Sequence, residues 1–556
     1  MIKLQFVLNM ESLRFVNYKA FDEGEMELRP LTLLLGANSS GKSSILHLLL
    51  MLEQTINNPD TYTAAFKTNG HSVSMGEDEN LLKDRKHNLQ MQLEFGIGPI
   101  EYINSIKKLL NEKEFEFISN YLMFLRYHDP QKFKDTIPHV GSELLDKKSI
   151  ISSPFLDTVK GLHNYKEIEA NEILFNIFAH SRFVPKAYSR DYWLGGNVEI
   201  LDEYWRSLNN CLKAFKSAFE PYPDKASIKY VLSFNENSRK LVVSECHVLV
   251  GDIAAIQILT HGRTSHVSSD VIDEKDIEVL MRGLNYYYEF DSLSIKSKTE
   301  SGSPFNDIVL ILVEQAFKQV QSFFSQKNLS YVGPLRANPQ RYYFLDDSNT
   351  SSSLDHRRGA SLAEVLKKNK PIREKINKWM SRFELNVDVK EFKDIIHNIK
   401  VTQNGLMLDI PDVGFGISQV LPILVEGLMA PSKSTIIMEQ PEIHLHPKMQ
   451  AELADLFIDI LNLQTKNKNK ISKHLIIETH SEYIIKRIRR RMAEGLISPR
   501  HVAIYFVKPR NSENPDSAKI EMAHISRDGS VEWPEEFYLT GMEDELAFFK
   551  AKIKKS

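Results

Sequence analysis

Residues 33 to 46 read LLLGANSSGKSSIL: an apolar run, Gly36, four residues, Gly41-Lys42-Ser43, and a second apolar run. This is the pattern of a phosphate-binding loop between a strand and a helix. Glycines at its two ends allow a tight turn whose N–H groups surround a phosphate, and the following helix points the positive end of its dipole at the same anion. A glycine and serine turn ahead of a buried helix is the alternative interpretation.

The side chains of this loop have predicted roles in binding ATP and Mg²⁺. Lys42 is expected to reach the β- and γ-phosphates, and the Ser43 hydroxyl is expected to ligate Mg²⁺. The candidate nucleotide contacts of the loop are Gly36, Asn38, Ser39, Gly41, Lys42, Ser43 and Ser44.

A second glycine-bearing segment, VGFGISQVLPIL at residues 413 to 424, precedes an apolar helix. Gly414 and Gly416, followed by Ser418 and Gln419, look like a degenerate signature segment of ABC-type ATPases. In that role Gly416, Ser418, Gln419 and the helix N-terminus would bind the γ-phosphate held by the opposite subunit. A glycine turn capped by Ser418 is an equally good interpretation of the segment taken alone.

The run STIIMEQPEIHLHP, residues 434 to 447, is apolar and then acidic. A buried strand that delivers carboxylates at its C-terminal edge is how P-loop proteins hold Mg²⁺ and water beside the γ-phosphate. Glu439 takes the place of the Mg²⁺-linked acid, and Gln440 stands where the water-polarising glutamate is usual. A carboxamide cannot accept a proton, so we expect slow hydrolysis unless Glu442 serves as the base. Loss of a general base costs about 10²–10⁴-fold in rate.

A third apolar run, within residues 474 to 488, ends in Thr479-His480-Ser481. His480 fits the switch histidine that senses the γ-phosphate, which completes the catalytic candidates Glu439, Gln440, Glu442 and His480. Each run alone could be core. In this order after a phosphate-binding loop, the three segments predict an ABC-type ATPase head.

The whole set resembles the ABC-type ATPases of the SMC, RecF and OLD group, in which the two halves of the site come from the two ends of the chain. The opening MESLRFVNYKAFDEGEMELRPLTLLLGANSSGKSS looks like the first hairpin and phosphate-binding loop of that group. Three stretches resemble a bacterial subfamily with a small C-terminal domain: YVGPLRANPQRYY (331 to 343), EQPEIHLHP (439 to 447) and ISRDGSVEWPEEFY (525 to 538). Length and layout are most similar to the PtuA ATPases of Septu and retron-linked anti-phage systems.

This resemblance implies ATP and Mg²⁺ as cofactors, an ATP-dependent head-to-head homodimer, and a regulatory role in anti-phage defence. The implied partners are a separate nuclease effector, such as the HNH protein PtuB that accompanies PtuA, and a reverse transcriptase with its RNA/DNA product. A RecF- or SMC-like repair or recombination ATPase acting directly on DNA is the alternative. No strand after His480 ends in the Asp-x-Asp of a Toprim nuclease, and no His-Asn-His pattern is visible, so we expect a partner to supply any nuclease activity.

Composition agrees with a cytoplasmic protein of two or three domains. The 556 residues carry a formal net charge of −3, with 42% hydrophobic and 26% charged side chains, which is ordinary for a globular protein and gives no global nucleic-acid signal. Cys211 and Cys246 are the only cysteines, so no disulfide framework is expected. No secretory segment is predicted, and the apolar run at residues 45 to 52 is far shorter than the roughly 20 residues of a membrane span.

Two further patterns have a structural and a functional interpretation. His444 and His446 form an H-x-H, but its place after the acidic segment and its spacing argue against a metal other than Mg²⁺. A basic run follows the switch histidine. It is expected to be a solvated helix surface, with contact to a DNA phosphate backbone as the functional alternative. Its members are Lys486, Arg487, Arg489, Arg490 and Arg491.

The split motifs predict an α/β fold in which both ends of the chain build the ATPase head. We expect a first lobe at residues 1 to 95, a compact and mostly helical insertion with some strands at 96 to 330, a second lobe at 331 to 499, and a small C-terminal hairpin and helix unit at 500 to 556. Prolines and aromatic residues interrupt any sustained heptad, so no long coiled coil is expected. Residues 462 to 473, rich in Lys and Asn, are predicted to be an exposed loop.

Overall fold

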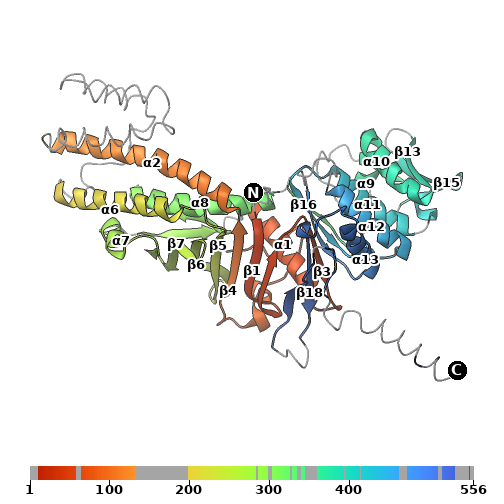
Figure 1. Cartoon of the computed structure of the whole chain (residues 1–556), viewed down its shortest axis with the longest axis horizontal. Helices are drawn as coiled ribbons and strands as arrows, with labels where there is room; N and C mark the ends of the chain where they lie inside the picture. The colour runs from red at the N-terminus through yellow and green to blue at the C-terminus, as the bar shows by residue number, and fades with distance from the viewer. Residues whose placement is uncertain are drawn as a thin grey trace, which may run out of the picture.

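The computed structural model describes residues 10–57, 64–128, 198–282, 286–298, 303–325, 328–334, 340–344, 360–392, 396–413, 415–461, 473–510, 516–526 and 528–532, with single positions at 131, 550 and 552. Two large sheets dominate these residues. Helix α1 (Lys42–Asn57) lies where the two sheets approach each other (Figure 1). The helices between residues 360 and 493 lie on the far side of the six-stranded sheet, which is called the central sheet below (Figure 1).

The central sheet contains six strands in the described chain, in the order β11–β16–β17–β3–β18–β19. They are β11 (Leu329–Val332), β16 (Ser434–Glu439), β17 (Lys473–Glu478), β3 (Leu31–Leu35), β18 (Val502–Lys508) and β19 (Lys519–Met522). The first five run parallel and β19 is antiparallel to β18. Because β3 comes from the N-terminal end and its two neighbours come from the C-terminal end, the predicted construction of the head from both ends is confirmed.

The central sheet is buried on both faces, as expected for parallel apolar strands. Along β3, Leu34 belongs to the core that includes α1, whereas Leu33 and Leu35 belong to a second core. The helices that contribute to this second core are α9 (Ala360–Lys368), α10 (Lys370–Met380), α11 (Phe415–Met429), α12 (Pro447–Ile460) and α13 (Glu482–Ala493). The alternation of side chains along β3 therefore places α1 and α11 on opposite faces of the sheet.

The other large sheet is antiparallel and has seven strands among the described residues, in the order β2–β1–β4–β5–β6–β7–β8. They are β2 (Phe21–Glu27), β1 (Met10–Tyr18), β4 (Met91–Ile97), β5 (Ala226–Asn235), β6 (Lys240–Val250), β7 (Ile253–His261) and β8 (Thr264–Ser268). The hairpin predicted at the start of the chain is β1–β2. The strands of the insertion continue this sheet from β4, so the sheet crosses the boundary predicted at residue 95.

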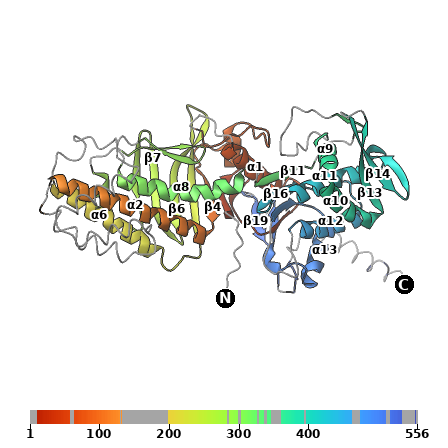
Figure 2. The ribbon, with the colours of Figure 1, turned by 90° about the horizontal axis from the view of Figure 1, so that it is seen from above.

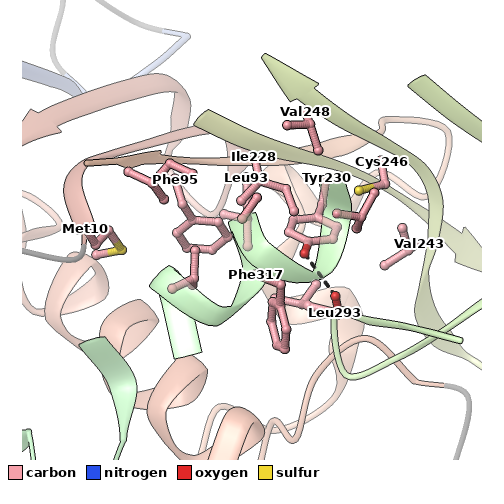
Figure 3. Packing of buried hydrophobic residues seen from close by; sticks show 14 of the residues in the cluster. Met10, Leu93, Phe95, Ile228, Tyr230, Val243, Cys246, Val248, Leu293 and Phe317 are labelled. Atoms are coloured by element: carbon pink, nitrogen blue, oxygen red, sulfur yellow. Dashed lines mark hydrogen bonds between the residues drawn. The ribbon is translucent and has the colours of Figure 1, made fainter. Parts of the chain in front are cut away.

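Helices of the insertion cover this antiparallel sheet. They are α2 (Pro99–His128), α6 (Val198–Ala218), α7 (Glu274–Met281) and α8 (Pro304–Phe324), with a small hairpin of β9 (Tyr288–Asp291) and β10 (Ser294–Ser297). Figure 2 shows α2, α6 and α8 side by side along the sheet. In the core beneath them the Tyr230 hydroxyl donates a 2.9 Å hydrogen bond to the Leu293 carbonyl (Figure 3). Within the described residues α2, with 30 residues, is the longest helix and no long coiled coil occurs.

A small sheet accompanies α9 and α10. It consists of β12 (Tyr343–Phe344), β13 (Leu385–Phe392), β14 (Ile396–Gln403) and β15 (Leu406–Asp409). Helix α10 precedes the signature segment in the chain. The loop predicted at residues 462 to 473 lies outside the described residues, apart from Lys473, which begins β17.

Both cysteines are buried free thiols. None of the helices among the described residues is long and apolar enough to cross a membrane.

The C-terminal hairpin is part of the central sheet, which corrects the separate unit predicted from residue 500. Strands β18 and β19 do pair as a hairpin. However, β18 also pairs in parallel with β3 along its first five residues. A Cβ atom on Gly36 would collide with the backbone carbonyl of Val507 in β18, so this strand forms one wall of the phosphate-binding loop. The other predicted boundaries remain predictions.

We predict that a chain ended at residue 499 fails to bind ATP, whereas a chain ended at residue 532 binds it. The shorter chain loses β18 and β19 and exposes the hydrogen-bonding edge of β3, while the longer one keeps both strands. Binding of a fluorescent ATP analogue and thermal unfolding would be measured for both chains. A soluble 499-residue chain with full-length affinity would contradict the role given to β18.

Candidate nucleotide-binding site

The phosphate-binding loop leaves the C-terminal end of β3 and enters α1. Gly36 and Gly41 have φ angles of 145° and 106°, which favour glycine over residues with a Cβ. Steric contacts also require glycine at both positions. A Cβ on Gly36 would collide with the Val507 carbonyl, and a Cβ on Gly41 would lie 2.7 Å from the Phe21 ring. The turn between them, which includes Asn38 and Ser39, is exposed at the end of the sheet. The predicted loop is thus held by β18 on one side and by β2 on the other.

Lys42 lies at the first position of α1 with its side chain folded over the loop. Its Nζ donates hydrogen bonds to the Gly36 carbonyl at 3.1 Å and the Ala37 carbonyl at 2.7 Å. Burial lowers the pKa of this amine, and the negative charges of Glu478 and Glu442 oppose that shift. The amine contacts the loop carbonyls and lies near two carboxylates, which suits a side chain that must meet phosphate oxygens.

Ser43 makes the contact that the sequence analysis missed. Its hydroxyl donates to the carboxylate of Glu478, with Oγ 2.9 Å from Oε2 and 3.1 Å from Oε1. Glu478 is the last residue of β17 and is 2% exposed. The sequence did contain a signal for it: Glu478 ends an apolar strand in the same way as Glu439.

Glu439 and Glu478 are directly paired in the register of two parallel strands, β16 and β17. Burial and the neighbouring charge of Glu439 both raise the pKa of Glu478, and the hydrogen bond from Ser43 opposes them. The buried Oε1 of Glu439 accepts no hydrogen bond and lies 3.3 Å from Nε2 of His47. Two carboxylates side by side repel each other, and a cation between the strand ends and the loop would relieve that repulsion.

These residues fit Mg²⁺. The donors at the strand ends are a hydroxyl and carboxylates, the hard oxygen ligands that Mg²⁺ prefers, and Mg²⁺ usually takes only one or two carboxylates and fills its other positions with phosphate oxygens and water. Ser43 and Glu439 would hold the ion, with Glu478 beside Ser43. When bound, Mg²⁺ neutralises charge that develops on the transferred phosphoryl group.

Gln440 and Glu442 form the turn after β16. The backbone N–H of Gln440, a residue with a φ of 42°, donates to the Glu478 carbonyl at 2.8 Å. The Oε1 atom of Glu442 accepts the backbone N–H of His480 at 2.7 Å. One oxygen of the candidate substitute base is therefore used to hold the switch-histidine loop. Partial burial and the charge of Lys42 lower the pKa of His480, which favours its neutral imidazole.

The signature residues lie on the face of the central sheet opposite α1. Gly414 lies outside the described residues, and Ser418 is 4% exposed in the first turn of α11. A Cβ on Gly416 would lie 3.3 Å from the His444 carbonyl, so the segment packs on the loop after β16. The side-chain Nε2 of Gln419 is buried without a hydrogen bond. Helix α11 contacts α9, α10 and α12, on the face of the sheet opposite α1.

His446 has a structural role. Its Nδ1 accepts the backbone N–H of Lys448 at 3.2 Å and so caps the N-terminus of α12. Among the described residues no group of three or more His, Cys, Asp or Glu side chains could hold a metal ion.

The basic run lies on α13, and ion pairs engage Lys486, Arg487, Arg490 and Arg491. Arg487 and Arg491 both contact Asp455 on α12 at 2.5 Å. Further pairs join Arg487 to Glu452, Arg491 and Arg490 to Glu494, and Lys486 to Glu482. These carboxylates offset the positive charge, which favours the structural interpretation of the run over DNA contact.

We predict that Gly36→Ala weakens the affinity for ATP by at least tenfold. It should also lower the melting temperature more than Gly262→Ala does. Both glycines have positive φ, a strain that costs about 1–3 kcal/mol for other residues. Only Gly36 faces a backbone carbonyl, because nothing lies within 4 Å of a Cβ on Gly262. Titration with a fluorescent ATP analogue would check this, and equal effects of the two substitutions would show that the β18 contact is unimportant.

Comparison with known proteins identifies the family of the chain. No curated protein matches the chain. Among solved structures, the SMC head domain from Thermotoga maritima has 8% identity and a TM-score of 0.32, covering 93% of this chain and 100% of that one. The Smc head domain with an extended coiled coil bound to the C-terminal domain of ScpA, derived from Pyrococcus furiosus, has 9% identity and a TM-score of 0.31, covering 92% and 96%. The family model described as AAA ATPase domain matches residues 10–190 and 265–485, well over half of the sequence. The chain therefore belongs to the AAA ATPase domain family.

Proposed function

We propose that this ATPase is a slow, ATP-dependent switch that closes as a head-to-head homodimer and regulates a separate effector in anti-phage defence. The proposal of slow hydrolysis rests on the residue after Glu439. Gln440 has a carboxamide at the position where a general base is usual. Glu442, the nearest substitute, has one oxygen on the backbone of His480. Positioning and electrostatic stabilisation of the phosphates are retained while proton abstraction is weakened.

The placement of the signature segment supports the homodimer. Ser418 and the phosphate-binding loop lie on elements that cover opposite faces of the central sheet. We infer that this serine contacts the γ-phosphate of a nucleotide held by a second chain. Because Ser418 is 4% exposed, the first turn of α11 must open to make that contact. The buried side-chain Nε2 of Gln419, in the same turn, donates no hydrogen bond, so this turn leaves a polar group without a partner.

The proposed partner is a nuclease such as an HNH protein, in a system that can include a reverse transcriptase and its RNA/DNA product. Support comes from the three subfamily-like stretches of the sequence. Helices α2 and α6 also extend far from the central sheet, which leaves surface for a partner away from the nucleotide (Figure 1). A RecF- or SMC-like ATPase acting directly on DNA is the second candidate, and the ion-paired basic run on α13 does not favour it.

We predict that Gln440→Glu raises ATP hydrolysis by at least tenfold, because a carboxylate can accept the proton of the attacking water. Wild-type chain with ATP should sediment as a persistent dimer, and the Gln440→Glu variant should return to monomer as ATP is consumed. The double variant Lys42→Ala/Gln440→Glu is the control and should neither hydrolyse ATP nor dimerise. Rapid hydrolysis by the wild type, unchanged in Gln440→Glu, would be incompatible with the slow switch.

The defence role is tested by co-expressing the tagged chain with an HNH nuclease of the PtuB type. We expect the nuclease to co-purify with the wild type, the purified chain alone to leave DNA uncut, and Lys42→Ala to remove protection in a phage challenge. DNA cleavage by the purified chain, or salt-dependent DNA binding without any partner, would favour the second candidate.

A further inference from the structure

The hydrogen bond between Ser43 and Glu478 has a function beyond holding α1 to β17. We propose that Glu478 is a positioning residue of the nucleotide site, whose carboxylate orients the Ser43 hydroxyl oxygen toward Mg²⁺. The proposal rests on the ATPase assignment and is independent of the effector and of the defence role.

The chemistry of the contact supports this role. A serine hydroxyl has one proton to donate and two lone pairs with which to accept. Ser43 donates that proton to Glu478, with both carboxylate oxygens within 3.1 Å of Oγ. The lone pairs of Oγ are then left for a metal, and a carboxylate acceptor makes the oxygen more electron-rich. Partners of this kind around metal ligands orient them and strengthen binding.

The backbone of Glu478 is fixed on both sides, so the carboxylate is held in place. Its carbonyl accepts the N–H of Gln440 at 2.8 Å, and the next N–H, of Thr479, donates to the Leu34 carbonyl at 3.1 Å. These bonds join the ends of β16, β17 and β3 next to the loop. The position of Ser43 is thereby tied to the central sheet as well as to α1.

A purely structural role for Glu478 is the competing explanation, because a buried carboxylate can accept the Ser43 hydrogen bond without any part in metal binding. The adjacent Glu439 argues against it. A second buried carboxylate lies at the paired position. Its Oε1 accepts no hydrogen bond and has only Nε2 of His47 nearby, at 3.3 Å, so the pair is costly to bury without a metal cation. Glu53 provides a matched comparison on the same helix. It is also a buried glutamate and accepts the Ser72 hydroxyl at 2.9 Å, but it lies ten residues beyond Ser43, about 15 Å along α1.

The test is the Mg²⁺ dependence of binding of a fluorescent ATP analogue, measured on Glu478→Gln, Ser43→Ala, the double variant and Glu53→Gln. In Glu478→Gln we expect binding in EDTA to stay within about twofold of wild type. The Mg²⁺ concentration for half-maximal enhancement should rise about 10–100-fold, as for other partners of metal ligands. The double variant should be no worse than Ser43→Ala, because both act through one oxygen. Glu53→Gln should keep the wild-type Mg²⁺ dependence whatever its melting temperature.

An unchanged Mg²⁺ dependence in folded Glu478→Gln would overturn the proposal, even if ATP hydrolysis fell, because the carboxylate would then act elsewhere. Additive losses in the double variant would also overturn it. If Glu478→Gln does not fold, Glu478→Asp replaces it: the charge remains but is one methylene further from Ser43, and a smaller rise in the Mg²⁺ requirement is expected. No rise in the aspartate variant would equally count against the role. None of these measurements involves a dimer or a partner, so their failure leaves the proposed switch untouched.

Discussion

The position of β3 between β17 and β18 is the constraint on which the rest of the site depends. Parallel strands deliver their C-terminal ends to one edge of a sheet, and the loops that leave this edge form the binding crevice. The phosphate-binding loop, the carboxylate of Glu478 and the Val507 carbonyl therefore meet because their strands are neighbours. Nucleotide binding is coupled to the folding of both ends of the chain.

Charge at this edge is arranged in opposing sets. The Lys42 amine lies against the loop carbonyls, and the carboxyl groups of Glu439, Glu442 and Glu478 lie at or just beyond the strand ends. Isolated, any of these groups would be costly to bury. Hydrogen bonds offset that cost for two of the carboxylates: Glu478 accepts one from Ser43, and Glu442 accepts one from the backbone N–H of His480. The Oε1 atom of Glu439 has only Nε2 of His47 nearby. The group with the fewest hydrogen bonds is the one to which the sequence assigns the metal.

Sequence patterns predicted the features that are local. The glycine spacing of the loop, the apolar strands β3, β16 and β17, and the β1–β2 hairpin follow from periodicity and turn residues over a few positions. Features that depend on pairing between distant segments were missed. The Ser43–Glu478 contact needs the register of β17 on β3, and the membership of β18 in the central sheet needs a parallel pairing that has no local signal. The ion pairs of Arg487 and Arg491 with Asp455 likewise depend on α12, more than thirty residues away.

Hydrogen exchange with and without Mg²⁺ and ATP tests most directly whether the two ends of the chain form one nucleotide site. The structure predicts protection of residues 36 to 46 together with 439 to 442, 478 to 481 and 505 to 508, because all four segments meet at one edge of the central sheet. Protection confined to residues 36 to 46, with the other three segments unchanged, would contradict it.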